Sequence, residues 1–230
     1  METLNCDVLS VREVNRALRM LPAGSEVRVI NTAGRHNIAV GLTETVSVLL
    51  AGNSGYFTGA LSGNSDGLGP DLVVDGFVGW SVGENLMGGS IRVKGSASQS
   101  AAASARGGTI VIEGNASLRA GISLKGATLA VAGNVGAMSG FMAQAGILLV
   151  GGDAGHGLGD SLYEAVIYVA GSIASLGADA QVEEMSNQDI LTVKLLIEMT
   201  GFDHIDPHCV TRVASARQLY NFSAENHGSY

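Results

Sequence analysis

The sequence predicts an all-β solenoid, a parallel β-helix with coils of about nineteen residues and one α-helix at each end. Three observations lead to this fold class. The chain between Gly69 and Gly171 contains six copies of one pattern, spaced nineteen residues apart. Each copy carries two β-favouring apolar residues two positions apart, which form one face of a short strand. Each copy then closes on a glycine, and one strand with one glycine corner per about twenty residues is typical of a solenoid.

The six copies align in columns. The first inward apolar column is Leu72, Ile91, Ile110, Leu129, Leu148 and Ile167. The second inward column is Val74, Val93, Ile112, Val131, Val150 and Val169. The closing glycines are Gly76, Gly95, Gly114, Gly133, Gly152 and Gly171. Successive strands should stack about 4.8 Å apart. We expect the glycines to stand at corners that need a positive φ or a close approach of neighbouring backbones.

Two further columns can fill the inside of the other sides of each coil. The second side has Val78, Ala97, Ala116, Val135, Ala154 and Ile173. The third side has Leu86, Ala105, Leu124, Ala143 and Leu162, alternating large and small as stacked layers require. Nineteen residues are too few for the strand, helix and return of most leucine-rich repeats, so a β-helix fits better.

One column of the strand points outward, and it is unusually apolar. Its members are Val73, Arg92, Val111, Ala130, Leu149 and Tyr168. A face in water should carry polar side chains, so we expect this face to be covered by the termini of the chain or by another subunit. Because terminal helices could cover only part of it, we expect a partner subunit to bind at Val111, Leu149 and Tyr168.

Residues 1–25 are predicted to form an N-terminal helix. Ser10 and Glu13 make a capping box, and Pro22 with Gly24 ends the helix. Short strands are expected at three places before the regular repeat, out of phase with its nineteen-residue period: 27–30, 38–40 and 46–50. They should form irregular first coils, followed by a loop over 63–70.

A second helix is predicted after the coils, which run to about residue 180. Ser186 and Asp189 form its capping box and Gly201 ends it. The tail after this helix shows no period. The chain thus divides into an N-terminal helix (1–25), the β-helix (26–182) and a C-terminal helix and tail (183–230), all within one structural domain. We expect the two helices to cover the open ends of the solenoid.

Composition points to a cytoplasmic, soluble protein. The chain has 33 glycines among 230 residues, and its start shows no basic segment followed by an apolar one, as a signal peptide would. No apolar run approaches the roughly 20 residues of a membrane span. Cys6 and Cys209 suggest no disulfide framework. A net charge of −8 disfavours nucleic acids and anionic membranes as partners.

The residues that could carry chemistry do not form a convincing constellation. Gly155 to Gly159 reads GxGxG, but no strand-to-helix unit surrounds it, so a solenoid corner is the better interpretation. His204, His208 and Cys209 lie close in sequence and could suggest metal ligation, although a closed site needs four ligands. Tail packing or an interface is the favoured interpretation of these three residues.

Other candidates are equally weak. Cys6 and Cys209 cannot by themselves hold an iron–sulfur cluster, which needs three or four thiolates. Three corner acids, Asp75, Asp153 and Asp160, are expected to be solvated or to cap local amides. The segment 96–105 is expected to form a flat surface of small side chains. We therefore predict no catalytic, cofactor-binding or metal-binding residue on this chain.

One stretch resembles a known family. Residues 75–89 and the Ser-Ile-Arg-Val that follows resemble the G-D-x-N-D-Y-V-G-K-G-L-S-G-G-x-I-x-V signature of the C-terminal GXGXG domain of glutamate synthase large subunits. The matching residues are Val82, Gly83, Leu86, Gly88 and Gly89. Glu84 and Asn85 replace the Lys-Gly of the signature, and its Asn-Asp is absent. Segments 31–41 and 52–61 add weaker matches, so the resemblance covers roughly 28–180.

Among stand-alone versions of this domain, the chain is most similar to the GXGXG subunit of N-methylglutamate synthase. Its size, its N-terminal helix and its tail VASARQLYNF (213–222) carry this resemblance. The resemblance implies a structural right-handed β-helix that holds together a class II amidotransferase-like subunit and a synthase subunit. FMN and an iron–sulfur cluster are implied on the synthase subunit and no cofactor on this chain, so the isolated chain should bind no FMN.

Three functions follow as hypotheses. The first is a non-catalytic subunit of a flavin-dependent glutamate synthase-like complex, which would convert methylamine and L-glutamate to N-methyl-L-glutamate and ammonia. The alternative is the GXGXG subunit of a formylmethanofuran dehydrogenase, a molybdenum or tungsten enzyme of one-carbon metabolism. The third is a free-standing β-helix enzyme, for which the sequence offers no residues. The genes beside this one would separate the first two.

Overall fold

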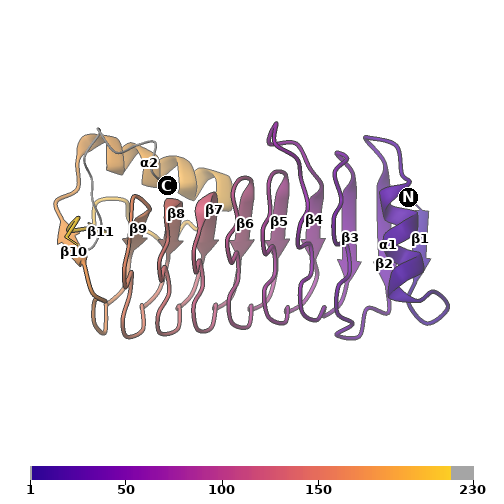
Figure 1. Cartoon of the computed structure of the whole chain (residues 1–230), viewed down its shortest axis with the longest axis horizontal. Coiled ribbons are helices and arrows are strands. Elements are labelled where there is room, and N and C mark those ends of the chain that lie inside the picture. Colours follow the sequence, from indigo (N-terminus) through magenta and orange to yellow (C-terminus); the bar gives the residue numbers. More distant parts are fainter. Residues whose placement is uncertain (1, 219–230) are drawn as a thin grey trace.

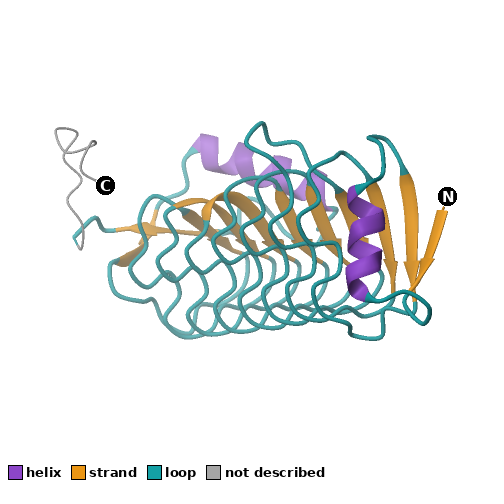
Figure 2. Ribbon diagram, turned by 45° about the vertical axis from the view of Figure 1, so that its right-hand side comes forward, coloured by secondary structure: helices purple, strands orange, loops and turns teal. Residues whose placement is uncertain are grey.

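The computed structural model describes residues 2–218 and confirms the predicted solenoid, whose coils form one continuous sheet of eleven strands (Figures 1 and 2). The strands are β1 (Glu2–Asn5), β2 (Glu26–Ile30), β3 (Ser47–Ala51), β4 (Asp71–Val74), β5 (Ser90–Val93), β6 (Thr109–Ile112), β7 (Lys125–Val131), β8 (Ala145–Val150), β9 (Val166–Val169), β10 (Ala180–Glu183) and β11 (Thr211–Ser215). Their order across the sheet is β1 to β9, then β11, then β10. Neighbours from β1 to β9 are parallel.

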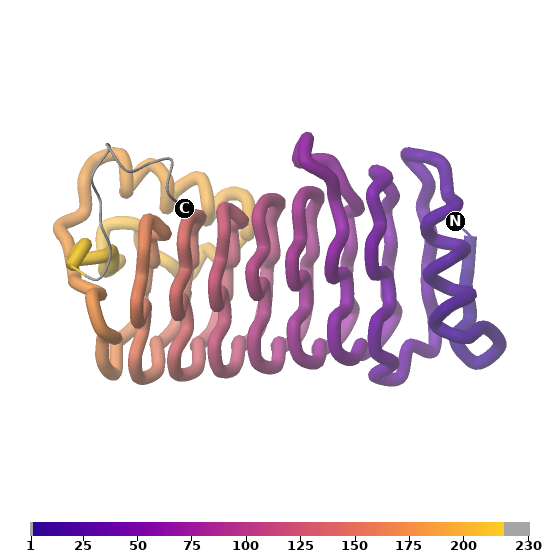
Figure 3. The backbone as a smooth tube through the Cα atoms, viewed as in Figure 1, coloured from indigo at the N-terminus to yellow at the C-terminus, as the bar shows by residue number. Residues whose placement is uncertain are grey.

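The register of the sheet follows the repeat. From β4 to β9 partners are nineteen residues apart, as in Leu72 beside Ile91, except at a register shift where Lys125 pairs with Ala145, twenty residues away. The two earlier coils are longer, because Val27 pairs with Val48 and Val48 pairs with Leu72, steps of 21 and 24 residues. The loop over 63–70 takes up part of the extra length. The early strands therefore join the same sheet through irregular coils, as expected (Figure 3).

The inside of the solenoid is a continuous apolar core. The two inward columns of the sheet are buried throughout. On the second side, parallel bridges link Val78, Ala97, Ala116, Val135, Ala154 and Ile173 in succession. The alternating leucines and alanines of the third side are buried as well. The segment 96–105 is only partly the expected surface, since Ala101, Ala102 and Ala105 face the core. Each buried Leu, Ile or Val contributes about 1.5–3 kcal/mol, so the rod is held along its whole length.

The bend between the second and third sides has an alternating backbone. In one coil Ser81, Gly83 and Asn85 have φ of 60°, 65° and 52°. The amides of Ser81 and Asn85 donate to the following coil, whereas that of Gly83 donates to Thr58 of the preceding coil. Alternation thus gives these amides partners on both neighbouring coils, which satisfies their hydrogen-bonding requirement.

The same bend decides two of the predictions made from the sequence. Gly157 and Gly159 occupy it with φ of 70° and 66°, which confirms that the GxGxG stretch is a solenoid corner. The strand predicted over 38–40 is wrong, because Asn37 and Ala39 have φ near 59° and belong to the bend of an earlier coil. Apolar residues there face the core without forming a strand.

The closing column needs glycine because neighbouring coils approach each other closely there, and not because its residues have a positive φ. A Cβ atom on Gly133 would lie 2.2 Å from Asn115 Oδ1. That oxygen accepts the backbone N–H of Asn134 at 2.8 Å, and Asn134 Oδ1 accepts that of Asp153 at 2.7 Å. Asp153 Oδ1 in turn accepts the N–H of Ser172 at 2.7 Å. We call this row of hydrogen bonds from side-chain oxygens to backbone amides the amide ladder. It holds neighbouring corners close together, so there is no room for a side chain on the glycine.

The N-terminal end of the solenoid is covered as predicted. Helix α1 (Val11–Arg19) has the Ser10–Glu13 capping box and buries Val14 and Leu18 against the first coil. The side chain of Asn15 donates to Asn37 O at 2.6 Å and accepts the N–H of Ala39 at 2.8 Å. The helix predicted over 1–25 is too long, because residues 2–5 form β1 and pair with β2.

The C-terminal end is closed differently from the prediction. Strand β11, which comes from the tail in which the sequence shows no period, pairs antiparallel with β9, and β10 pairs antiparallel with β11. The second helix, α2 (Asn187–Thr200), does not cover this end but runs alongside the sheet (Figure 1). Within residues 2–218, no helix is long and apolar enough to cross a membrane.

Candidate protein-interaction surfaces

Helix α2 covers the outer face of the sheet over β6 to β9. Its capping box of Ser186 and Asp189 and its end at Gly201, with φ of 77°, are as predicted. The second apolar cluster of the protein joins α2 and the segment after it to the outward column: Val111, Ala130, Leu149, Tyr168, Val193, Leu196, Phe202, Ile205 and Val210. The expectation that a partner binds at Val111, Leu149 and Tyr168 is therefore wrong. The chain returns over its own coils and buries them.

Arg92 holds the C-terminal end of α2. Its guanidinium donates to the carbonyl of Thr200 at 3.2 Å and pairs with Glu113 at 2.9 Å. The last turn of α2 contains no basic residue. A cation at a helix C-terminus is stabilising, and here the solenoid supplies it from the outward column.

The N-terminal end of α2 is held by Asp189. Its Oδ1 accepts from Tyr168 Oη at 2.6 Å and from Arg212 Nε at 3.0 Å. Burial alone would raise the pKa of Asp189, but hydrogen bonds from Ser186, Tyr168 and Arg212 outweigh it and lower the pKa to about 2. Burial and the hydrogen bond to Asp189 raise the pKa of Tyr168.

This carboxylate should make the protein sensitive to acid. The pKa of Asp189 is about 2 in the folded chain and about 3.9 in an unfolded one, so its contribution of about 2 kcal/mol is present above pH 4 and is lost as the pH falls to 2. Urea unfolding from pH 6 to pH 2 should show a flatter profile for Asp189→Asn than for the wild type. The other carboxylates contribute equally to the pH dependence of the wild type and of the variant, so the difference between the two profiles reports on Asp189. Two parallel profiles would contradict the assignment.

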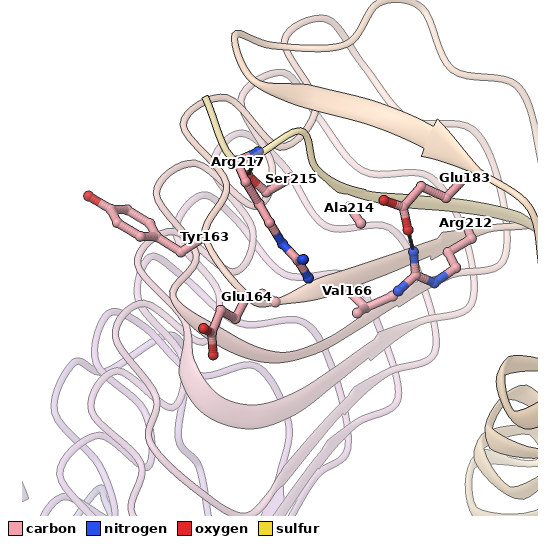
Figure 4. Close-up of a pocket in the computed structure, with 9 residues that line it drawn as sticks. Tyr163, Glu164, Val166, Glu183, Arg212, Ala214, Ser215 and Arg217 are labelled. Carbon is pink, nitrogen blue, oxygen red and sulfur yellow. Dashed lines mark hydrogen bonds and ion pairs between the residues drawn. The ribbon is translucent and has the colours of Figure 1, made fainter. Parts of the chain in front are cut away.

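A pocket of about 270 Å³ lies beside this network, where β9 meets β11 (Figure 4). Its lining is Tyr163, Glu164, Ala165, Val166, Glu183, Arg212, Ala214, Ser215 and Arg217. The guanidinium of Arg212 is paired with Glu183 and Asp189. The hydroxyl of Ser215 donates to Asp179 at 2.8 Å. These polar groups hold the last strands together. The hydroxyl of Ser215 is bonded to the carboxylate of Asp179, and the pocket lining contains no histidine.

The tail residues considered for a metal do not converge. His204 Nε2 lies 3.0 Å from the carbonyl oxygen of Ala132. The amide of His208 and the thiol of Cys209 both bond to Asp206, at 2.9 and 3.4 Å. The hydrogen bond to Asp206 raises the pKa of the Cys209 thiol. Among the described residues, no three His, Cys, Asp or Glu side chains are placed to hold a metal ion. The contact of His204 with the coil agrees with the packing interpretation.

The remaining candidates serve the coils. Asp75 pairs with Lys94 at 3.2 Å. Asp153 belongs to the amide ladder, and the N–H and hydroxyl of Ser172 lower its pKa. Asp160 accepts the N–H of Ala178 at 3.1 Å. Capping of local amides is thus confirmed for Asp153 and Asp160. Cys6 is buried near the N-terminal end, whereas Cys209 is exposed.

An exposed aromatic ladder stands on three successive coils, the two irregular ones and the first regular one. The rings of His36, Tyr56 and Trp80 stack in succession, with centroids 4.3 and 5.1 Å apart. Tyr56 and Trp80 are 38% and 47% exposed, and the nearby Phe57 and Phe77 are exposed too. Rigid exposed aromatic groups of this kind are typical of protein interfaces. The repeat pattern did not reveal the ladder, because Tyr56 and Trp80 are 24 residues apart and fall outside the nineteen-residue columns.

A second exposed apolar surface lies on α2. Leu191, Leu195 and Met199 are 53%, 63% and 44% exposed. Their spacing of four places them in one line on the helix. The helix buries Val193 and Leu196 against the sheet, so it is apolar on two sides. The capping box and the end of this helix could be predicted from the sequence. Its second apolar side was not predicted. The signal was present in the sequence, because a helix that is apolar on every side is usually buried on every side.

Comparison with known proteins finds a relative that matches the chain from end to end. The chain is 48% identical over 233 residues to Protein GlxC from Rhizobium meliloti (strain 1021), and the match spans 100% of both chains. No protein-family profile matches the chain. The similarity therefore extends over every element of the fold and is not limited to one repeated coil.

Proposed function

The chain belongs to the family of Protein GlxC, and from this premise we propose that it is a structural subunit of a glutamate synthase-like complex. One observation carries the proposal. A rod with a continuous core presents two separate apolar surfaces, the aromatic ladder and the outer line of α2. A protein that must hold two others in a fixed relation needs such a rod and two such surfaces.

The spacing of the two surfaces suits this role. The aromatic ladder stands on the coils that contain β2 to β4, whereas α2 packs on β6 to β9. At about 4.8 Å per coil, Trp80 lies roughly 10–24 Å along the rod from the strands under α2. Two partners can therefore bind side by side without competing for the same residues.

The finer proposal is a subunit of N-methylglutamate synthase, acting in the cytoplasm in methylamine and nitrogen metabolism. The resemblance of residues 75–89 to the GXGXG signature supports it. The partners would be a class II amidotransferase-like subunit and an FMN-binding synthase subunit that also carries the iron–sulfur cluster. The chain would itself do no chemistry and would hold the two partners together for the conversion of methylamine and L-glutamate to N-methyl-L-glutamate and ammonia.

Co-expression of the chain with these two subunits tests the proposal. We expect one complex on size-exclusion chromatography, with flavin absorbance that is absent from the chain expressed alone. Omitting the chain should leave the two partners eluting apart and should abolish formation of N-methylglutamate. Partners that associate and turn over equally well without the chain would overturn the bridging role. Copurification with molybdopterin-binding chains would identify the formylmethanofuran dehydrogenase alternative instead.

A further inference from the structure

The outer line of α2, which we call the α2 ridge, consists of Leu191, Leu195 and Met199. It points away from the side of α2 that packs on the sheet, where Val193 and Leu196 are buried. Its ends are eight positions apart in the helix, so the ridge is about 12 Å long. Both ends of the helix are held to the solenoid, by Asp189 and by Arg92. The ridge is therefore a fixed apolar feature, and a partner can bind it without first ordering the helix.

The surroundings of the ridge are acidic. Residues 180–210 carry six acidic side chains and one basic one. Their formal net charge is −5, whereas that of the whole chain is −8. Two of the acids, Glu183 and Asp189, are paired with Arg212. The other four are exposed: Glu184, Glu198, Asp203 and Asp206. Lys194 is the single basic residue of the segment. Arg92, which meets the end of α2, is paired with Glu113. The helix and the residues that flank it, which we call the acidic rim, therefore have a net negative charge.

The combination of an apolar ridge and an acidic rim points to one kind of partner. We propose that the α2 ridge docks into an apolar groove of another protein subunit whose rim carries lysine and arginine side chains. This rests on the proposed function, because it names the chemistry of one of the two bridged partners. A second copy of this chain is a poor occupant, since two acidic rims would be brought together and would repel each other.

The proposal can be tested on the co-expressed complex with Leu191→Gln/Leu195→Gln. Glutamine keeps the helix propensity and removes the apolar surface. The matched control is Leu118→Gln/Met142→Gln, which removes two exposed apolar side chains from the coils. We expect the ridge variant to bind one of the two subunits at least tenfold more weakly by surface plasmon resonance, with unchanged circular dichroism, while the control binds as the wild type does.

A charge variant tests the rim. Glu198→Lys/Asp203→Lys should slow association with the same subunit and should reduce the dependence of the association rate on salt. Unchanged binding of both the ridge and the charge variants, in a complex that still assembles, would overturn the docking proposal and leave the bridging role intact. Failure of the wild type to bind either subunit would overturn both. A wild-type chain that dimerises through the ridge, with a monomeric glutamine variant, would show that a second copy is the occupant and would overturn the basic-groove assignment.

Discussion

Replacing Gly114 with valine is expected to lower the free energy of unfolding by about 3–5 kcal/mol. A Cβ atom at this position would lie 2.5 Å from Ser96 Oγ and 2.9 Å from the carbonyl carbon and oxygen of Gly95. The Gly95 atoms belong to the backbone of the preceding coil, which is paired on both sides and cannot move away alone. Urea unfolding followed by circular dichroism measures the loss.

Gly24 offers a matched control for this substitution. It has φ of 81° but no atom within 4 Å of the position that a Cβ would take. Gly24→Ala should therefore cost only the backbone penalty of a left-handed residue, about 1 kcal/mol. A Gly114→Val protein as stable as the Gly24→Ala protein would show that the coils do not approach as closely as the amide ladder requires.

The second large effect is expected from Leu149→Lys combined with Tyr168→Lys. Both side chains are buried beneath α2, with exposures of 0% and 3%. Both substitutions would remove apolar contacts, and at position 149, inside the apolar cluster, the lysine charge would be buried without a partner unless α2 is displaced. The substitution should cost about 4 kcal/mol or more and should expose the amides of α2 to hydrogen exchange.

The exposed face of the same helix provides the comparison. Leu191→Lys with Leu195→Lys likewise introduces two lysines, but on the exposed α2 ridge, where they should alter the free energy of unfolding by less than about 0.5 kcal/mol per site. If the Leu149 and Tyr168 lysines were as well tolerated as these, α2 would not be packed on the outward column.

The parts of the fold that repeat locally could be predicted from the sequence. Leu72, Ile91 and their counterparts reveal the strands because every coil buries the same position. The capping boxes at Ser10 and Ser186 reveal both helices because a cap depends on residues only three apart. The period also places the closing glycines, although the reason for them, close approach to the amide ladder, needs the stacked coils to be seen.

Features that depend on distant segments could not be predicted. Nothing local in Thr211–Ser215 shows that it inserts between β9 and β10, since its partners in β9 lie more than forty positions away and those in β10 about thirty. The placement of α2 on the outward column depends on Arg92, about 100 residues away, meeting the end of the helix. The aromatic ladder arises where coils of unequal length bring Tyr56 beside Trp80. The bend at Asn37 and Ala39 looks like a strand in sequence because residues 38–40 form a short apolar run.

The antiparallel strand β11 has a consequence for polymerisation. A parallel rod that ended in a bare coil would offer β9 as a template, and β1 of another molecule could continue the stack head to tail into a fibre. Here β11 occupies that edge in the opposite direction, and β10 lies outside it. The hydrogen-bonding pattern of the coils cannot continue past this reversal. The reversed strand therefore blocks filament growth at this end of the molecule.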